Sequence, residues 1–65
     1  MKNRLREIRA RQRITQFSLR LGSGIHQSKI SMFENDLIEL NKDEIIKLSI
    51  VLGVKPEEIF PAEVK

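Results

Sequence analysis

Residues 15–35 read Thr-Gln-Phe-Ser-Leu-Arg-Leu-Gly-Ser-Gly-Ile-His-Gln-Ser-Lys-Ile-Ser-Met-Phe-Glu-Asn, and this stretch decides the fold. Thr15 is well suited as the N-cap of a helix that runs from Gln16 to about Ser23. Gly24 stands at the centre of a turn, and a second helix begins near residue 26 or 27 and ends near residue 35. The sequence therefore predicts two short helices joined by a glycine turn.

The second of these helices has one apolar face and one polar face. At about 100° per residue, Ile30 and Phe33 point to one side, toward apolar residues of the preceding helix and turn (Phe17, Leu19 and Ile25). The opposite wedge gathers uncharged side chains: Gln27, Ser28, Ser31, Met32 and Asn35. Glutamine suits bidentate pairing with adenine, serine bonds to several bases, and methionine can contact a thymine methyl group. We expect this face to read base edges in the major groove, as in a helix-turn-helix. The alternative is a solvated polar face that binds nothing.

Further polar residues border this face. Gln16 begins the first helix, where its side chain and the free N–H groups of the helix N-terminus can hold a phosphate oxygen. We expect Lys29 and Asn35 to grip the DNA backbone in a similar way, and His26 to act as a cap or phosphate contact. The alternative for Gln16 is ordinary polarity at the start of a helix. Nothing in the sequence indicates a metal-binding or catalytic role for His26.

A first helix is expected over residues 2–13, ahead of this unit. Arg9 faces inward on that helix, and Glu34 ends the second helix of the unit on its inner edge. A partly buried ion pair between them would lock the first helix to the polar-faced helix. The alternative is two unrelated surface charges.

Two more helices follow. One is predicted over residues 42–52, because Asn41 has the spacing of an N-cap with Glu44 at position N3, and Gly53 stands where a helix-ending glycine should. A short last helix is predicted over residues 56–60, with a proline at its first position. The expected fold is thus all-α, a compact bundle of five helices.

Size and composition narrow the possibilities further. The chain has 65 residues, no cysteine and one histidine, so we expect one small domain over residues 1–65, without disulfides, structural zinc or other cofactors. Stability must then come from helix packing, from dimerisation, or from both. We place the core-forming and dimer-forming material in residues 41–65 and the loop before them. The apolar candidates for the dimer surface are Leu37, Ile38, Leu40, Ile59, Phe60 and Val64.

Charge is unevenly distributed along the chain. Residues 1–20 hold seven basic residues and one acidic residue, whereas residues 30–65 hold four lysines and eight acidic residues. Such polarity suits a protein that faces phosphates with one side. The alternative is a solvated arginine-rich helix. No apolar run approaches the length of a membrane span and no signal peptide is evident, so we expect a cytoplasmic protein.

At this point the chain resembles the Cro and phage-repressor (C1) type of helix-turn-helix family, from residue 1 to residue 60 without gaps. The matching segments are Leu5 to Arg9, Thr15-Gln16, Gly24-Ile25, Gln27-Ser28, Ile30-Ser31, Phe33 to Asn35, 47–54 and 57–60. The resemblance implies a five-helix repressor-like fold, DNA binding as a two-fold dimer and control of transcription. It further implies a prokaryotic or phage-encoded protein that is associated with the nucleoid when bound to DNA. It also implies an Arg9–Glu34 pair and a phosphate-binding Gln16. Arg20 and Ser23 depart from the family pattern, which has a small residue and a leucine-like core residue at these positions.

We therefore expect a sequence-specific regulator, acting as a repressor, that binds a near-palindromic double-stranded DNA operator as a homodimer. The alternative from another class is a protein-interaction module on the same scaffold, such as an antitoxin. Its interface would use exposed apolar residues that include Ile38, Leu40, Ile46 and Ile50. An enzyme is not expected, because the sequence offers no acid–base pair, activated nucleophile or phosphate-cradling glycine loop. No small-molecule ligand is expected either.

Overall fold

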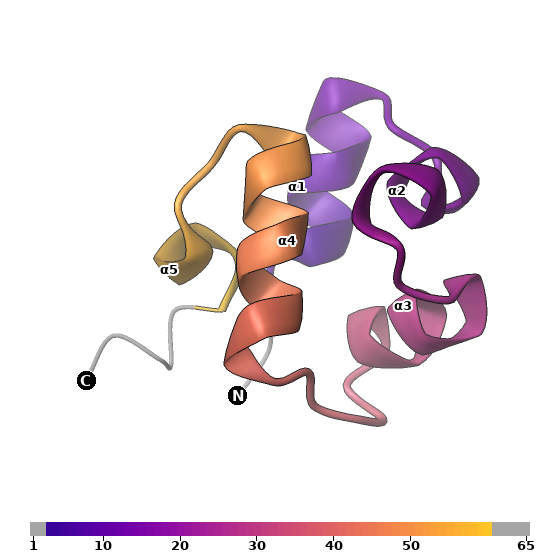
Figure 1. Ribbon diagram of the computed structural model, residues 1–65. Helices are drawn as coiled ribbons and strands as arrows, with labels where there is room; N and C mark the ends of the chain where they lie inside the picture. Colours follow the sequence, from indigo (N-terminus) through magenta and orange to yellow (C-terminus); the bar gives the residue numbers. More distant parts are fainter. Residues whose placement is uncertain (1–2, 61–65) are drawn as a thin grey trace.

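Five helices and no strand make up residues 3–60, the part of the chain that the computed structural model describes (Figure 1). In chain order they are α1 (Leu5–Gln12), α2 (Gln16–Ser23), α3 (Gln27–Glu34), α4 (Lys42–Leu52) and α5 (Pro56–Ile59). The predicted all-α, five-helix architecture is confirmed.

Capping residues set most helix boundaries, as the sequence predicts. Thr15 Oγ1 accepts a hydrogen bond from the Ser18 N–H at 3.0 Å, which satisfies a free donor of the first turn of α2. Gly24 ends α2 with φ of +77°, a left-handed conformation that glycine adopts without a steric penalty. At α4, Asn41 Oδ1 accepts from the Glu44 N–H at 2.8 Å and Glu44 Oε1 accepts from the Asn41 N–H at 3.0 Å. These caps determine where α2 begins and ends and where α4 begins.

The first helix is shorter than the expected span of residues 2–13. It begins at Leu5, whose N–H donates to Asn3 Oδ1 at 3.0 Å, and it ends at Gln12. Arg13 then adopts a left-handed conformation, with φ of +59°, and turns the chain toward α2. The side chain of Asn3 thus supplies a start signal that the helical pattern of the sequence does not reveal.

The core lies around α4, which packs against α1, α2 and α5. Its buried apolar residues come from every helix and from the turns between them: Leu5, Ile8, Leu19, Ile25, Ile30, Phe33, Leu40, Ile45, Leu48, Leu52 and Ile59. Leu5 and Ile59 are both fully buried, and the Arg4 N–H donates to the Ile59 carbonyl oxygen at 2.7 Å. The first and last described helices are therefore joined directly.

Burial corrects three expectations about apolar side chains. Leu40 and Ile59 belong to the core, so they are unavailable for the dimer surface, and Leu40 is equally unavailable for the antitoxin-like interface. Phe17 is 52% exposed instead of packing under α3, because it lies on the outer side of α2. Val64 lies outside the described residues. By contrast, Leu37 and Ile50 are more than two-thirds exposed, at 71% and 73%.

Ser23 occupies a buried position although it is polar. Its hydroxyl donates to the Leu19 carbonyl oxygen at 2.7 Å, and Ser23 Oγ accepts from the Ile25 N–H at 3.2 Å. Because both roles of the hydroxyl are satisfied, the burial carries no penalty for an unpaired polar group. The same two bonds brace the turn that leads into α3.

Candidate nucleic-acid interface

The polar face of α3 points outward on an anchored helix. Ile30 and Phe33 are buried in the core beneath it. On the outer side, Ser28 and Met32 are exposed, while Gln27 and Ser31 are half-buried. Figure 1 shows α3 at the edge of the bundle, next to α2 and joined to it by the short turn. The arrangement therefore presents small hydrogen-bonding groups from a helix whose position is fixed by its own apolar face.

His26 caps the N-terminus of α3. Its Nδ1 accepts a hydrogen bond from the Ser28 N–H at 3.2 Å, and Ser28 Oγ lies 2.9 Å from the same nitrogen. Both side chains are exposed. His26 and Ser28 thus lie together at the tip of α3, beside Gln27.

A buried carboxylate connects three helices behind this face. The Glu34 side chain has no exposed surface, and it accepts from Arg9 Nε at 2.8 Å and from Arg9 Nη2 at 3.1 Å. Arg9 Nη1 also donates to the Ile14 carbonyl oxygen at 3.0 Å. Gln16 Nε2 donates to Glu34 Oε1 at 3.0 Å. Glu34 therefore holds α1 and the start of α2 against the end of α3.

Asn35 and Arg6 extend this network to the surface. Arg6 Nη2 donates to Asn35 Oδ1 at 2.8 Å, and Asn35 Nδ2 donates to the Ser31 carbonyl oxygen at 2.9 Å. Arg6 Nε also lies 3.6 Å from the Glu34 carboxylate. From the sequence, only Arg9 was expected to pair with the end of α3, and the Arg6 contact was not predicted.

Lys29 is 44% exposed at its side chain, but it is paired with a carboxylate of another helix. Its Nζ donates to Glu44 Oε2 at 2.6 Å, which joins α3 to the first turn of α4. The hydrogen bond from Lys29, together with the Asn41 backbone N–H, holds the pKa of Glu44 below its ordinary value. The sequence analysis identified Glu44 only as a helix cap. Opposite charges 15 positions apart gave no reason to pair these two residues.

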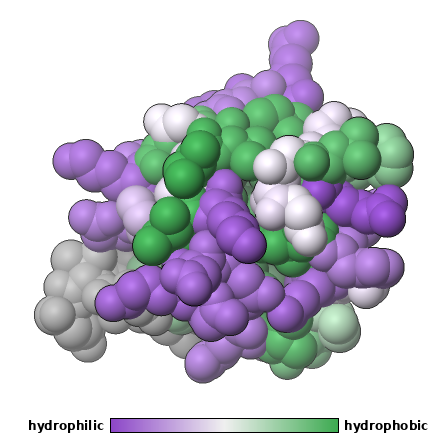
Figure 2. Space-filling view, viewed as in Figure 1, coloured by the Kyte–Doolittle hydropathy of each residue, from purple (hydrophilic) through white to green (hydrophobic). Residues whose placement is uncertain are grey.

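The remaining arginines of the basic segment lie at the surface. Arg4 and Arg11 both pair with Glu7, at 3.6 and 2.7 Å. Arg13 and Arg20 are exposed and form none of the ion pairs found among residues 3–60. Figure 2 shows hydrophilic side chains over much of one face, with apolar side chains reaching the surface between them.

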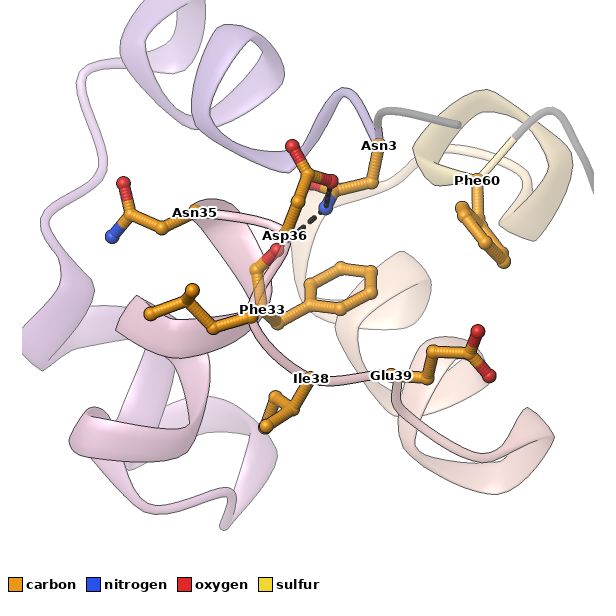
Figure 3. Close-up of a pocket in the computed structure, with 8 residues that line it drawn as sticks. Asn3, Phe33, Asn35, Asp36, Ile38, Glu39 and Phe60 are labelled. Atoms are coloured by element: carbon orange, nitrogen blue, oxygen red, sulfur yellow. Dashed lines mark hydrogen bonds between the residues drawn. The ribbon is translucent and has the colours of Figure 1, made fainter.

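A hollow of about 570 Å³ lies on another part of the surface, between the residues before α1 and the segment between α3 and α4 (Figure 3). Asp36 and Glu39 border it, and the rings of Phe33 and Phe60 lie edge to face at its base, with centroids 6.2 Å apart. Carboxylates at this rim repel phosphates. The hollow therefore belongs to the acidic part of the molecule and not to the polar face of α3.

Within residues 3–60, no three histidine, aspartate or glutamate side chains are placed to share a metal ion. None of the helices described is long and apolar enough to cross a membrane.

Two short helices joined by a left-handed glycine, the second with an outward polar face, define a helix-turn-helix. A family model described as helix-turn-helix matches residues 5–59. The chain belongs to this family, of the Cro/C1 type, and is a DNA-binding transcription regulator, not an enzyme.

A solved structure gives a more particular likeness. The fold is similar to the crystal structure of the restriction-modification controller protein C.AhdI from Aeromonas hydrophila, with a TM-score of 0.83 and 32% sequence identity. The match covers 88% of this chain and 86% of C.AhdI. No curated protein sequence matches the chain significantly.

Proposed function

We propose that this protein represses transcription by binding a near-palindromic operator as a homodimer, with α3 in the major groove. The observation that carries the proposal is the outward face of α3, on which Gln27, Ser28 and Met32 are accessible while Ile30 and Phe33 fix the helix from beneath. Uncharged hydrogen-bonding side chains on a rigid helix are suited to base readout.

Base contacts are assigned to four residues of α3. Gln27 is suited to a bidentate pair with adenine, and Ser28 and Ser31 to single hydrogen bonds. Met32 is 38% exposed and can lie against a thymine methyl group. These side chains lie on consecutive turns of one helix, so they would contact successive base pairs of one half-site.

Backbone contacts are assigned to the borders of this face. One N–H of Gln16 Nε2 donates to Glu34 Oε1, which fixes the orientation of the amide. Its second N–H and the N–H groups of the first turn of α2 are the donors proposed for a phosphate. His26 and Asn35 offer further polar contacts at the two ends of α3. Arg13, in the turn just before α2, adds a positive charge beside Gln16.

Dimerisation is proposed through apolar residues outside the DNA-facing surface. Ile50 and Leu37 are strongly exposed, Ile46 is partly exposed, and Ile38 and Phe60 pack only partly against the core. A 65-residue domain without disulfides gains stability by covering such side chains. Two copies related by a two-fold axis would place their α3 helices in adjacent major grooves, about 34 Å apart.

The likeness to C.AhdI suggests which genes are regulated. Because that protein is a restriction-modification controller, we propose that this chain acts on a promoter of the same kind of gene system. The two chains cover most of each other's length, so the likeness extends beyond the helix-turn-helix unit.

Selection of bound duplexes from a random DNA pool tests the proposal. The expected result is enrichment of one motif with two inverted half-sites, centred about one helical turn apart. A pool that shows no enriched motif would refute sequence-specific binding. A protein-interaction module would instead bind its partner through apolar surface with little dependence on salt, whereas DNA binding weakens steeply as salt is raised.

A further inference from the structure

We infer that Glu44 holds the ammonium group of Lys29 away from the DNA backbone, so that α3 enters the groove without a phosphate contact from its own cation. The inference rests on the proposed function, since it concerns the same surface. It also revises the expectation from the sequence that Lys29 grips a phosphate.

The geometry of the pair carries the inference. Lys29 Nζ lies 2.6 Å from Glu44 Oε2, and the side chains of Lys29 and Glu44 are 44% and 18% exposed. The other oxygen of the same carboxylate accepts the Asn41 N–H at 3.0 Å. Glu44 is therefore fixed by the helix cap, so Lys29 meets a positioned anion and not a mobile surface side chain.

The Lys29–Glu44 hydrogen bond is expected to persist when DNA is bound. A charge-assisted hydrogen bond is stronger than a neutral one, and partial burial reduces its screening by salt. A glutamate is already ionised at neutral pH, and the hydrogen bond from Lys29 holds the pKa of Glu44 lower still. A phosphate would have to displace an anion that is already in place and held by the backbone.

Lys29 is the only lysine or arginine of α3. With its charge matched by Glu44, the helix offers the groove amide, hydroxyl and thioether groups alone. Other basic residues, among them Arg13 and Arg20, then supply the attraction to phosphates that is independent of DNA sequence. Glu44 would thus set how strongly the protein binds DNA of any sequence.

The salt dependence of DNA binding measures this directly, because each neutralised phosphate steepens the plot of log affinity against log salt by about 0.9. The test uses the full chain and a duplex of random sequence. Glu44→Gln removes the charge but keeps an oxygen that accepts the Asn41 N–H, so the capping box persists. For Glu44→Gln we expect a slope that is steeper than the wild-type slope by about 0.9. If the two proteins bind equally at 1 M salt, this slope makes the affinity of the variant about eightfold higher at 0.1 M salt.

Three variants complete the design. Lys29→Met alone should leave the wild-type slope unchanged, and Lys29→Met with Glu44→Gln should return the slope to that value. Asp43→Asn is the matched control, because it removes the same charge from the neighbouring exposed residue and should not steepen the slope. Circular dichroism checks that every variant keeps its helices.

The inference alone would be overturned if Lys29→Met had a flatter slope than the wild type, or if Glu44→Gln had the same slope as the wild type. It would also be overturned if the double variant kept the steeper slope of Glu44→Gln, or if Asp43→Asn steepened the slope as much as Glu44→Gln. A wild-type protein that binds no duplex at any salt concentration would overturn the inference together with the proposed function. The two failures are therefore distinguishable.

Discussion

Arg9 and Glu34 lie 25 positions apart in the sequence and are joined by two hydrogen bonds, of 2.8 and 3.1 Å, in which both carboxylate oxygens accept from the guanidinium group. This contact ties α1 to the last residue of α3. The orientation of α3, the helix proposed to face DNA, therefore depends on a residue of the basic first helix.

Replacing Arg9 with methionine should destabilise the fold strongly. The Glu34 side chain is fully buried, so removing its main partner leaves a poorly compensated charge, and we expect a loss of about 3 kcal/mol in the free energy of unfolding. Urea denaturation measures the loss. Arg11→Met is the control, because the exposed Arg11–Glu7 pair should contribute less than about 1 kcal/mol. Equal losses in the two variants would contradict a special role for the buried pair.

Gln27→Ala should relax the choice of base at one position of the half-site. We expect a loss of about 1–3 kcal/mol on the selected operator, with little change on random DNA. Gln16→Ala should instead weaken binding to all sequences alike, since a phosphate contact carries no sequence information. Competition binding against operator variants separates the two patterns. An unchanged base preference in Gln27→Ala would remove this residue from the set that reads bases.

Ile50→Glu should convert the proposed dimer into a folded monomer. The Ile50 side chain is 73% exposed on α4, so the substitution leaves the core intact while placing a charge in an apolar interface. Sedimentation analysis measures the molecular mass in solution. Leu21→Glu, at an exposed apolar position of α2, is the control and should remain dimeric. An Ile50→Glu protein that sediments like the wild type would place the interface elsewhere.

The Lys29–Glu44 pair should make stability depend on pH in the acidic range. The pKa of Glu44 is lower in the folded chain than in an unfolded one, so the folded state favours the ionised carboxylate. This contribution is complete above about pH 4.3, the ordinary glutamate pKa, and is lost as pH falls through the lower folded value. Thermal unfolding from neutral to acidic pH measures it. The difference in melting temperature between wild type and Glu44→Gln should shrink as the pH falls below about 4.3. A difference that stays constant with pH would contradict the assignment.

The helix boundaries were largely predictable from the sequence because they depend on local chemistry. Thr15, Asn41 and Gly24 act on backbone groups within a few residues, so their positions alone define where α2 and α4 begin and where α2 ends. The start of α1 was not predictable in this way. It depends on Asn3, whose carboxamide oxygen accepts from the Leu5 N–H in a segment without a helical pattern.

The polar face of α3 was predictable for a similar reason, since helical periodicity alone separates Gln27 and Met32 from Ile30. Among contacts between distant segments, the Arg9–Glu34 pair was predicted, but most others were not. The partner of Lys29 depends on how the segment after α3 returns α4 to the bundle, and the burial of Leu40 depends on the same path. Leu40 and Leu37 are the same apolar residue type, but only the structure shows that Leu40 is buried and Leu37 is exposed.

The bond between the Arg4 N–H and the Ile59 carbonyl oxygen affects how the domain is made in the cell. A ribosome releases the chain from its N-terminus, so α1 emerges before α5, whose Ile59 is buried in the same core as Leu5. The bond from Arg4 to Ile59, and the part of the core to which Ile59 belongs, therefore form only after α5 has been synthesised. For the same reason, a nascent chain stalled before residue 59 cannot close this fold, and a reporter of folding should respond only after that residue has left the exit tunnel.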